Sequence, residues 1–414
     1  MSGPRETPNK HKILNDPVYG FISLPHELIH DLIEHPFFQR LRRIKQLGLT
    51  HLVYPGALHT RFHHALGAMH LMQEAINVLR SKGHRIGEDE AQGALVAILL
   101  HDIGHGPFSH ALEKALVRDV DHEDISSMVM DRLNEAFGGR LETGIRIFRN
   151  EHEEAFLHAL VSSQLDMDRL DYLKRDSFYS GVSEGIVSSD RIIKMLDVHN
   201  DELVVEEKGI YSVEKFIVAR RLMYWQVYLH KTVVSAEHML LQALKRARDL
   251  AEEGVELFAT PPLHRFLYER FDRERFDQDP KALDNFMKLD DADIMSSIKV
   301  WCKHEDPVLA DICERLTDRR LFRIELQERA FSDAYVESIR DRVRDRLQVP
   351  EEAIDHYVIQ DSTSNHAYVP GRETINMLMN DGSHMDLAKA SDNLNISALS
   401  HPVEKFFLCY PKEC

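Results

Sequence analysis

Cysteine is scarce in this sequence and widely spaced. Only 4 of the 414 residues are cysteines, and none forms the close pair that a thiolate metal site needs. They are Cys302, Cys313, Cys409 and Cys414. This usage indicates a reduced compartment in which the thiols have a minor structural role.

Long apolar runs are also missing. No stretch approaches the ~20 apolar residues that a helix needs to cross a bilayer. The opening MSGPRETPNKHK lacks the apolar core of a signal peptide. We therefore expect a cytoplasmic protein that is neither exported nor bound to a membrane.

Positive charge is outnumbered. The chain carries 51 Lys and Arg against 68 Asp and Glu, a formal net charge of -17. This balance argues against broad adhesion to nucleic acid or to an anionic membrane, but it leaves room for a local basic pocket that holds a small polyanion. The arginines of residues 318–329 and 339–347 alternate with Asp and Glu, which favours salt-bridged helix faces over a nucleic-acid surface.

The remaining composition is that of an ordinary globular protein. Hydrophobic residues make up 43% and charged residues 29%, and the length allows two domains. We expect a mainly α protein, with a helical bundle over residues 1–275 followed by a smaller α+β region over residues 276–414. Breaks at the prolines near 261 and 280 precede the change in pattern.

Apolar periodicity locates the expected elements. It predicts helices over residues 37–49, 91–100, 125–137, 164–179 and 213–250. Further along it predicts short helices over 284–316, a helix over 330–347, and strands at 321–326, 355–361 and 406–410.

Histidine is abundant, and its placement is unusual. The chain has 25 histidines, and several cluster between residues 51 and 122. The stretch LLHDIGHGPFSH, residues 99–110, places three histidines and an aspartate at the end of an apolar run. Burial of such groups is costly unless they are paired or bound to a metal ion, so a purely structural helix end is the weaker interpretation.

Four side chains in this part of the sequence suit a divalent cation. They are His64, His101, Asp102 and Asp168, which we expect to come from three packed helices in a core of about residues 50–180. Imidazole nitrogen and carboxylate oxygen favour Mn, Mg, Fe, Co, Ni or Zn over thiolate-loving ions, and the identity of the ion stays open.

The motifs RFHHALG, LLHDIGHGPFSH and DMDRLDYLKRD together resemble those of the HD superfamily of metal-dependent phosphohydrolases. The segments ILNDPVYGFISL, FFQRLRRIKQLG, VYPGALHTRFHHALG and YLHK are similar to the deoxynucleoside triphosphate (dNTP) triphosphohydrolase branch, which includes dGTPase-like and SAM-and-HD-domain enzymes. The likeness covers roughly residues 12–250 and implies an HD-domain helical bundle that holds the four metal ligands.

The resemblance also implies roles for four catalytic residues. His105 corresponds to a residue near the α-phosphate, and His110 to a catalytic histidine that His122 supports. Glu113 stands where the family often has Asp, which lengthens the carboxylate by one methylene and keeps its charge. The alternative is that His110 and Glu113 merely pair on a helix surface.

A second set of residues corresponds to the substrate pocket of the family. Gln46 and Leu47 match positions that line the sugar and base. The positions that match phosphate or sugar contacts are Arg61, Arg169, Tyr172 and Lys231. Tyr228 matches a ring beside the sugar that could exclude a ribose hydroxyl, although an aromatic residue on a long helix is more often part of the core.

A third set matches a regulatory nucleotide site between subunits of the SAM-and-HD-domain enzyme. It consists of Lys12, Asn15, Gln39 and Arg42. The alternative is a solvated basic helix face formed by Arg40, Arg42, Arg43 and Lys45. An activating nucleotide and a homo-oligomer, dimer or tetramer, follow from the resemblance as expectations.

The expected function is therefore hydrolysis of dNTPs to deoxynucleoside and inorganic triphosphate. Two alternatives remain. One is an HD phosphohydrolase that acts on another nucleotide, although the GYP motif of the cyclic-dinucleotide branch is absent. The other is a non-catalytic protein that senses nucleotides or binds nucleic acid, which the intact metal ligands disfavour.

Overall fold

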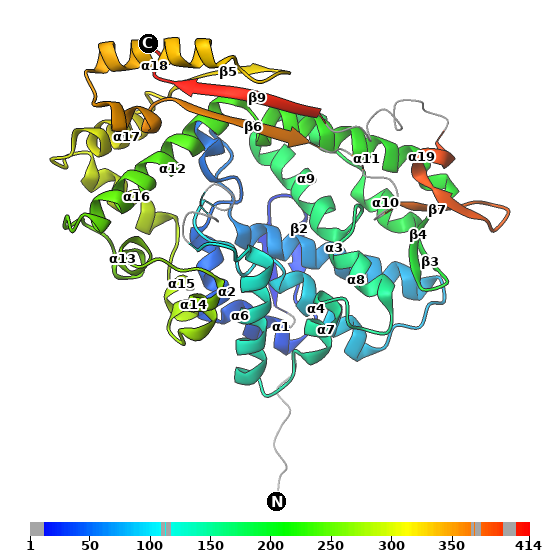
Figure 1. Cartoon of the computed structure of the whole chain (residues 1–414). Coiled ribbons are helices and arrows are strands. Elements are labelled where there is room, and N and C mark those ends of the chain that lie inside the picture. Colours follow the sequence, from blue (N-terminus) through cyan, green and yellow to red (C-terminus); the bar gives the residue numbers. More distant parts are fainter. Residues whose placement is uncertain (1–11, 109–111, 113–116, 366–367, 369–373, 392–402) are drawn as a thin grey trace, which may run out of the picture.

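The computed structural model describes residues 12–108, 112, 117–365, 368, 374–391 and 403–414. Helices dominate these residues, and a small sheet packs at one end with the C-terminal strand (Figure 1). The prediction of a mainly α bundle followed by a smaller α+β region is confirmed. Within the described residues, no helix is both long enough and apolar enough to cross a membrane.

Three helices form the centre of the bundle, and each matches an apolar pattern in the sequence. They are α3 (Arg61–Ser81), α4 (Glu88–Leu100) and α9 (Met167–Ser180). Helix α4 is buried almost throughout from Ala91 onward, as its continuous apolar run predicts. Helix α3 packs against both of the others, so its first turns lie beside the end of α4 and the start of α9.

The other elements surround this centre. The N-terminal half contains β1 (Ile13–Asp16), β2 (Gly20–Ser23), α1 (Glu27–Glu34), α2 (Pro36–Gln39), α6 (His122–Ala136), α7 (Glu142–Phe148), α8 (Ala155–Val161), α10 (Ser189–Met195), β3 (Leu196–His199), β4 (Glu202–Glu206), α11 (Ile210–Met223) and α12 (Lys231–Glu252). The rest contains α13 (Pro261–Tyr268), α14 (Arg273–Gln278), α15 (Ala282–Phe286), α16 (Asp291–Trp301), α17 (Pro307–Thr317), β5 (Arg323–Gln327), α18 (Asp333–Leu347), β6 (Ile359–Asn365), β7 (Asn376–Leu378), β8 (His384–Asp386), α19 (Leu387–Ala390) and β9 (Val403–Tyr410).

The C-terminal strands form two different sheets. Strand β9 pairs antiparallel with both β5 and β6, so Cys409 stands between Ile324 and Ile359. Strand β7 instead pairs in parallel with β4, where Val205 lies opposite Met377. The last part of the chain therefore pairs with a strand of the helical body. The predicted domain boundary at residue 275 stays a prediction.

The single helix predicted over residues 37–49 is wrong. Helix α2 gives way to a 3-10 helix at Arg40–Arg43, and Ile44 is extended. The cause is tertiary pairing, because the carbonyl of Ile44 accepts from the Arg61 amide at 3.0 Å and the Gln46 amide donates to the His59 carbonyl at 3.0 Å. The solvated-face interpretation also fails for Arg40, which is fully buried and donates from Nε to the Leu289 carbonyl at 2.6 Å.

The long helix predicted over residues 213–250 is interrupted. Helix α11 ends at Met223, a π-helical turn covers Tyr224–Tyr228, and His230 is extended before α12 starts. The ring of His230 caps α12 by accepting from the Thr232 amide at 3.2 Å. Single π-helical turns occur often at functional sites, and this one lies beside the cavity described below.

A buried polar chain joins the central helices to the N-terminal hairpin. Asp171 of α9 binds His64 of α3, with 2.7 Å between Oδ2 and Nδ1, and it accepts from Arg175 Nε at 2.9 Å. Arg175 also donates to Asp16 of β1, with 2.8 Å between Nη1 and Oδ2. Gly67 faces this chain, and a Cβ there would overlap Asp171 Oδ1 and Arg175 Nη2 and lie 2.7 Å from Asp171 Cγ.

Gly67→Ala should lower the free energy of unfolding by about 1–3 kcal/mol or more, because the new methyl group overfills a packed polar contact. Elsewhere in a helix the same change usually raises stability by about 0.4–1 kcal/mol. Chemical denaturation measures the difference. Ser81→Ala, at the exposed end of the same helix, is the matched control, and a Gly67→Ala protein as stable as the wild type would contradict the packing described.

Candidate functional site

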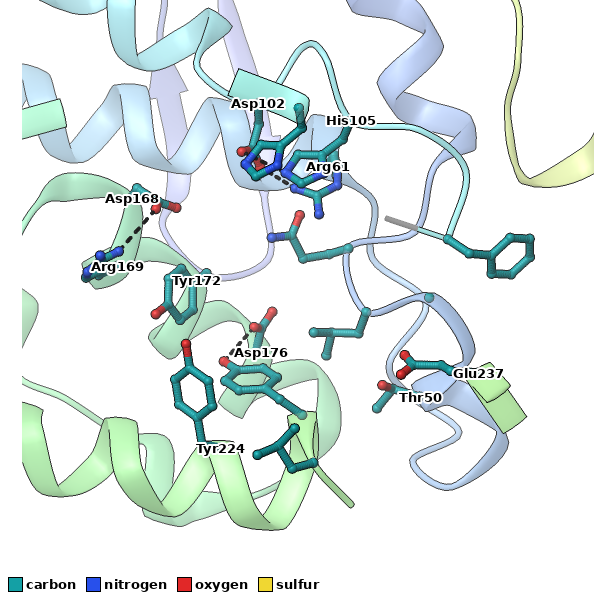
Figure 2. A pocket seen from close by; sticks show the side chains of 17 residues that line it. Thr50, Arg61, Asp102, His105, Asp168, Arg169, Tyr172, Asp176, Tyr224 and Glu237 are labelled. Carbon is teal, nitrogen blue, oxygen red and sulfur yellow. Dashed lines mark hydrogen bonds and ion pairs between the residues drawn. The ribbon is translucent and has the colours of Figure 1, made fainter. Parts of the chain in front are cut away.

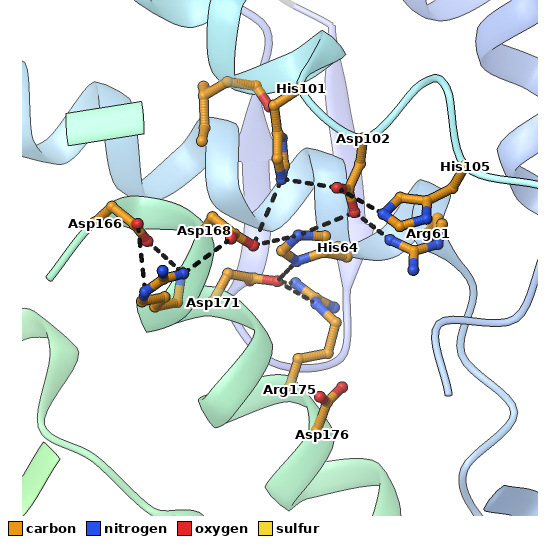
Figure 3. Close-up of polar contacts among 12 residues, drawn as sticks. Arg61, His64, His101, Asp102, His105, Asp166, Asp168, Asp171, Arg175 and Asp176 are labelled. Carbon is orange, nitrogen blue, oxygen red and sulfur yellow. Dashed lines mark hydrogen bonds and ion pairs between the residues drawn. The ribbon is translucent and has the colours of Figure 1, made fainter. Parts of the chain in front are cut away.

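The four candidate metal ligands meet where the three central helices converge (Figure 3). His64 Nε2 lies 3.0 Å from Asp168 Oδ1 and 3.7 Å from Asp102 Oδ2. His101 Nε2 lies 3.4 Å from Asp102 Oδ1 and 3.5 Å from Asp168 Oδ1. Residues that are about a hundred positions apart in the sequence thus lie together: His64, His101 and Asp168 form one group that could hold an ion, and Asp102 adjoins it in a second group with His105 and His122.

A hydrogen bond at Nδ1 fixes the orientation of each imidazole, that of His64 and that of His101. The Nδ1 atom of His101 lies 2.6 Å from the Ile98 carbonyl, which can only accept, so this nitrogen carries the proton. Asp171 holds Nδ1 of His64 in the same way. Each Nε2 atom can therefore offer a lone pair when its ring is neutral. Both are buried, and they face the Asp102 and Asp168 carboxylates without a hydrogen bond of normal geometry to any described residue. Two such nitrogens with two carboxylates fit a divalent transition ion or magnesium.

The electrostatics of the cluster favour positive charge. Burial lowers the pKa of His64, but its contacts with Asp168 and Asp171 outweigh burial and raise the pKa to about 10. Burial raises the pKa of Asp168, and its contacts with His101 and His64 lower the pKa far below the ordinary value. Both effects mean that the cluster holds a proton strongly when no cation is bound, and that protons compete with a metal ion for it.

A second histidine pair adjoins the cluster. Asp102 forms an ion pair with Arg61 and lies 3.3 Å from His105 Nε2. The rings of His105 and His122 stack with their centroids 3.9 Å apart. Burial and the charge of Arg61 hold the pKa of His105 well below its ordinary value, so this ring is neutral. His110 and Glu113 lie outside the described residues.

A cavity of about 420 Å³ opens beside these groups (Figure 2). The predicted residues that line it are Gln46, Leu47, Arg61, Asp102, His105, His122, Asp168, Arg169, Tyr172 and Tyr228. His64 is fully buried behind Asp102 and Asp168. Lys231 is exposed at the start of α12 and is not among the lining residues.

Helix α9 divides the motif DMDRLDYLKRD between two faces. Asp168, Tyr172 and Asp176 follow one another at four-residue spacing and line the cavity, whereas Asp171 and Arg175 face α3. Asp176 was missed in the sequence analysis, although this spacing signals it. It accepts from Tyr228 Oη at 2.8 Å and lies 2.7 Å from His59 Nε2, so it fixes the Tyr228 ring on the cavity wall.

Further lining residues have no signal in the sequence. They are Gly48, Thr50, Phe108, Tyr224, Leu229 and Glu237. Glu237 is partly buried on α12, and burial alone raises its pKa from 4.5 to about 7. The described part of the chain offers it no hydrogen bond or ion pair. The sequence pattern does not identify Glu237 as a cavity residue, because a carboxylate at a solvent-exposed position of an amphipathic helix has the same pattern.

The expected regulatory residues lie apart from the cavity. Gln39 donates to the Ile33 carbonyl at 2.8 Å and accepts from Arg42 Nε at 2.8 Å. The guanidinium of Arg42 stacks over the Phe62 ring, 3.6 Å from its centroid. Lys12 and Asn15 are exposed at β1.

The chain is similar in sequence and fold to known proteins. Residues 61–176 match the HD domain family, and residues 187–259 match the HD associated region. The chain is 34% identical to the uncharacterized protein YwfO of Bacillus subtilis, over 100% of this chain and 95% of that one. A crystal structure of a phosphohydrolase from Bacteroides thetaiotaomicron is 51% identical, with a TM-score of 0.94 over 97% of this chain and 100% of that one.

Another relative carries a more specific name. It is the deoxynucleoside triphosphate triphosphohydrolase SAMHD1 homolog of Dictyostelium discoideum, 32% identical over 57% of this chain and 49% of the relative. The chain therefore belongs to the HD-domain superfamily of hydrolases, and part of it is similar to the dNTP triphosphohydrolase-like members of that superfamily.

The pKa of Glu237 generates a prediction about stability. Because its folded-state pKa of about 7 lies above the ordinary value, the proton stabilises the folded state below pH 4.5, and this stability is lost as the pH rises to about 7. Glu237→Gln removes the titration, so the variant should unfold at a higher temperature than the wild type. The gap should widen between pH 5 and pH 7 and stay constant above. A gap that is independent of pH would show that Glu237 is not buried as described.

Proposed function

We propose that the protein hydrolyses dNTPs to deoxynucleosides and inorganic triphosphate. The observation that carries this proposal is the cluster of inward-facing imidazoles and carboxylates at the wall of a cavity that also contains Arg61 and Arg169. A polyanionic substrate needs this combination of cation and arginine. The names of the SAMHD1 relatives support the same assignment.

His64, His101, Asp102 and Asp168 are the residues that would hold a divalent ion, one of Mn, Mg, Fe, Co, Ni or Zn. When bound, such an ion neutralises charge on the attacked phosphate. Their fit rests on the buried Nε2 atoms of His64 and His101, which face two carboxylates and make no hydrogen bond of normal geometry in the described part of the protein.

Two arginines hold the remaining phosphates in this proposal. Arg61 reaches the cavity from the first turn of α3, while its ion pair with Asp102 fixes its position. Arg169 lies 3.7 Å from Asp166 and 4.0 Å from Asp168, and its Nε makes no hydrogen bond among the described residues. Burial lowers the pKa of Arg169, but Asp166 and its neighbours raise it further, so the guanidinium stays charged. Arg169 therefore keeps a donor for phosphate oxygens, and Arg61 contributes its positive charge.

Hydrolysis requires a proton for the departing sugar oxygen. Water forms a bond to the α-phosphorus, the bond from that phosphorus to O5′ breaks, and O5′ takes a proton. We assign the proton donor to His110, with Glu113 and His122 supporting it and neutral His105 near the α-phosphate. A histidine with a pKa near neutrality suits this role.

Two tyrosines that line the cavity, Tyr172 and Tyr228, account for a preference for deoxyribose over ribose. Tyr172 and Tyr228 meet edge to face, with 6.1 Å between ring centroids, and Asp176 anchors the Tyr228 hydroxyl. A fixed ring against C2′ leaves no room for a ribose hydroxyl.

The other predicted residues keep their proposed roles. Gln46 and Leu47 complete the wall around the sugar and base. Lys231 remains a phosphate contact, which would have to be made from outside the cavity. We also keep Lys12, Asn15, Gln39 and Arg42 as a site for an activating nucleotide between subunits of a homo-oligomer.

Product analysis tests the activity. The purified protein is incubated with Mn or Mg and each dNTP, alone and as a mixture, and the products are separated by ion-exchange chromatography. We expect deoxynucleoside and intact triphosphate, and activity in the mixture alone would add nucleotide activation. Release of orthophosphate or pyrophosphate would move the protein to another HD activity, and absence of turnover with any metal would favour a nucleotide sensor.

Asp168→Ala should remove most of the bound metal and of the activity, because it deletes a carboxylate shared by both imidazoles. The helical circular dichroism should remain, since Asp168 is 23% exposed at its side chain and belongs to the first turn of α9. Elemental analysis of the purified protein gives the metal content. Asp190→Ala, which deletes an exposed aspartate of α10, is the control. Full turnover in a metal-free Asp168→Ala protein would refute the ligand assignment.

A further inference from the structure

The cavity has two chemically different ends (Figure 2). Asp102, Asp168, Arg61 and Arg169 lie at one end, and Glu237 lies beside Thr50 at a distance from them. The phosphates must occupy the end with the arginines. Among the described residues, no arginine or lysine lines the cavity beside Glu237, so that end is left for the nucleoside.

Glu237 differs from the other carboxylates around the cavity. Asp176 has Tyr228 and His59 as partners, and Asp102 has Arg61 and His105. For Glu237, burial is the only influence on the pKa, and the described residues place no donor or cation against it. The carboxylate is partly exposed to the cavity and has no partner among the described residues, so a ligand in the cavity can supply the donors.

We propose that Glu237 recognises the nucleobase of the substrate by its Watson–Crick edge and favours guanine. This inference rests on the proposed function. Guanine presents two adjacent donors, N1–H and the N2 amino group, which match the two oxygens of a carboxylate. Adenine and cytosine each present one donor beside an acceptor, and thymine presents one donor between two acceptors, so an ionised carboxylate satisfies none of them as fully.

The pKa of Glu237, about 7, supports this assignment. Burial disfavours the anion, and two donors from a bound guanine would stabilise it and lower the pKa on binding. Leu47 and Tyr228 also line the cavity, and their apolar surfaces are suited to packing against a sugar and the face of a base.

A competition experiment with Glu237→Gln tests the inference. Equal concentrations of the four dNTPs are placed in one reaction, so that any activating nucleotide is present equally for every protein, and the ratios of the released deoxynucleosides give the ratios of kcat/KM. The wild type should favour dGTP by about 5- to 100-fold, the discrimination expected of one bidentate contact. The glutamine amide offers one acceptor and one donor, so the variant should lose this preference and gain relative activity on dATP and dCTP.

Glu256→Gln, the same substitution at an exposed residue outside the cavity, should behave as the wild type. Glu237→Ala should flatten the preferences without favouring adenine or cytosine. An unchanged order of preference in Glu237→Gln, with normal release of triphosphate, would overturn the role of Glu237 and leave the proposed function intact.

A wild-type protein that hydrolyses no dNTP would overturn the proposed function instead. Calorimetric binding of the four dNTPs to the wild type and to Glu237→Gln then decides the inference separately. Tighter binding of dGTP that is lost in the variant would support base recognition, and equal affinities in both proteins would overturn it.

Discussion

Asp171 is the residue on which the geometry of the site depends. Its carboxylate holds the imidazole of His64 in one orientation and simultaneously accepts from Arg175, which in turn binds Asp16 in the N-terminal hairpin. Burial raises the pKa of Asp171, but Arg175 and His64 outweigh burial and lower it to about 2, so the carboxylate stays ionised at any physiological pH. Removing one member of such a buried chain leaves uncompensated charge, which costs more than the pair contributes to stability. The hairpin, α3 and α9 are therefore coupled to the direction in which one nitrogen points.

The same helix serves two environments with one short motif. Positions 168, 172 and 176 of α9 carry groups that face the cavity, and positions 171 and 175 carry the buried pair that faces α3. A helix can do this because residues four apart share a face and residues three apart lie close to it. The absence of a Cβ at Gly67 lets the paired groups pack against α3. The density of charged residues in DMDRLDYLKRD, which by itself suggests a solvated helix, instead reflects two separate polar contacts.

The sequence predicts the central helices well and the irregular segments poorly, and the four metal ligands stay a prediction. The continuous apolar run of α4 and the HD motifs depend on local pattern and on spacing, which are visible in the chain. The segment after α2 departs from its helical pattern because the backbone at Ile44 and Gln46 bonds to residues about fifteen positions away, and no local pattern encodes that pairing. The helix predicted over residues 213–250 breaks after Met223 at a π-helical turn, which its apolar pattern does not indicate. His110 and Glu113, the expected proton-transfer residues, are assigned by resemblance alone.

The break between α11 and α12 determines which residues line the end of the cavity that contains Glu237. If α11 and α12 formed one straight helix, the residues after Tyr224 would continue along the direction of α11. The π-helical turn and the extended His230 instead change the direction of the chain. Tyr224 and Tyr228 therefore both line the cavity, and so does Glu237, which lies about two turns after the start of α12. A glutamate at this position lowers stability above pH 5, because folding then has to keep a proton on a group that water would ionise. Residues that reduce stability in this way are concentrated at functional sites, where a ligand satisfies what the folded protein alone does not.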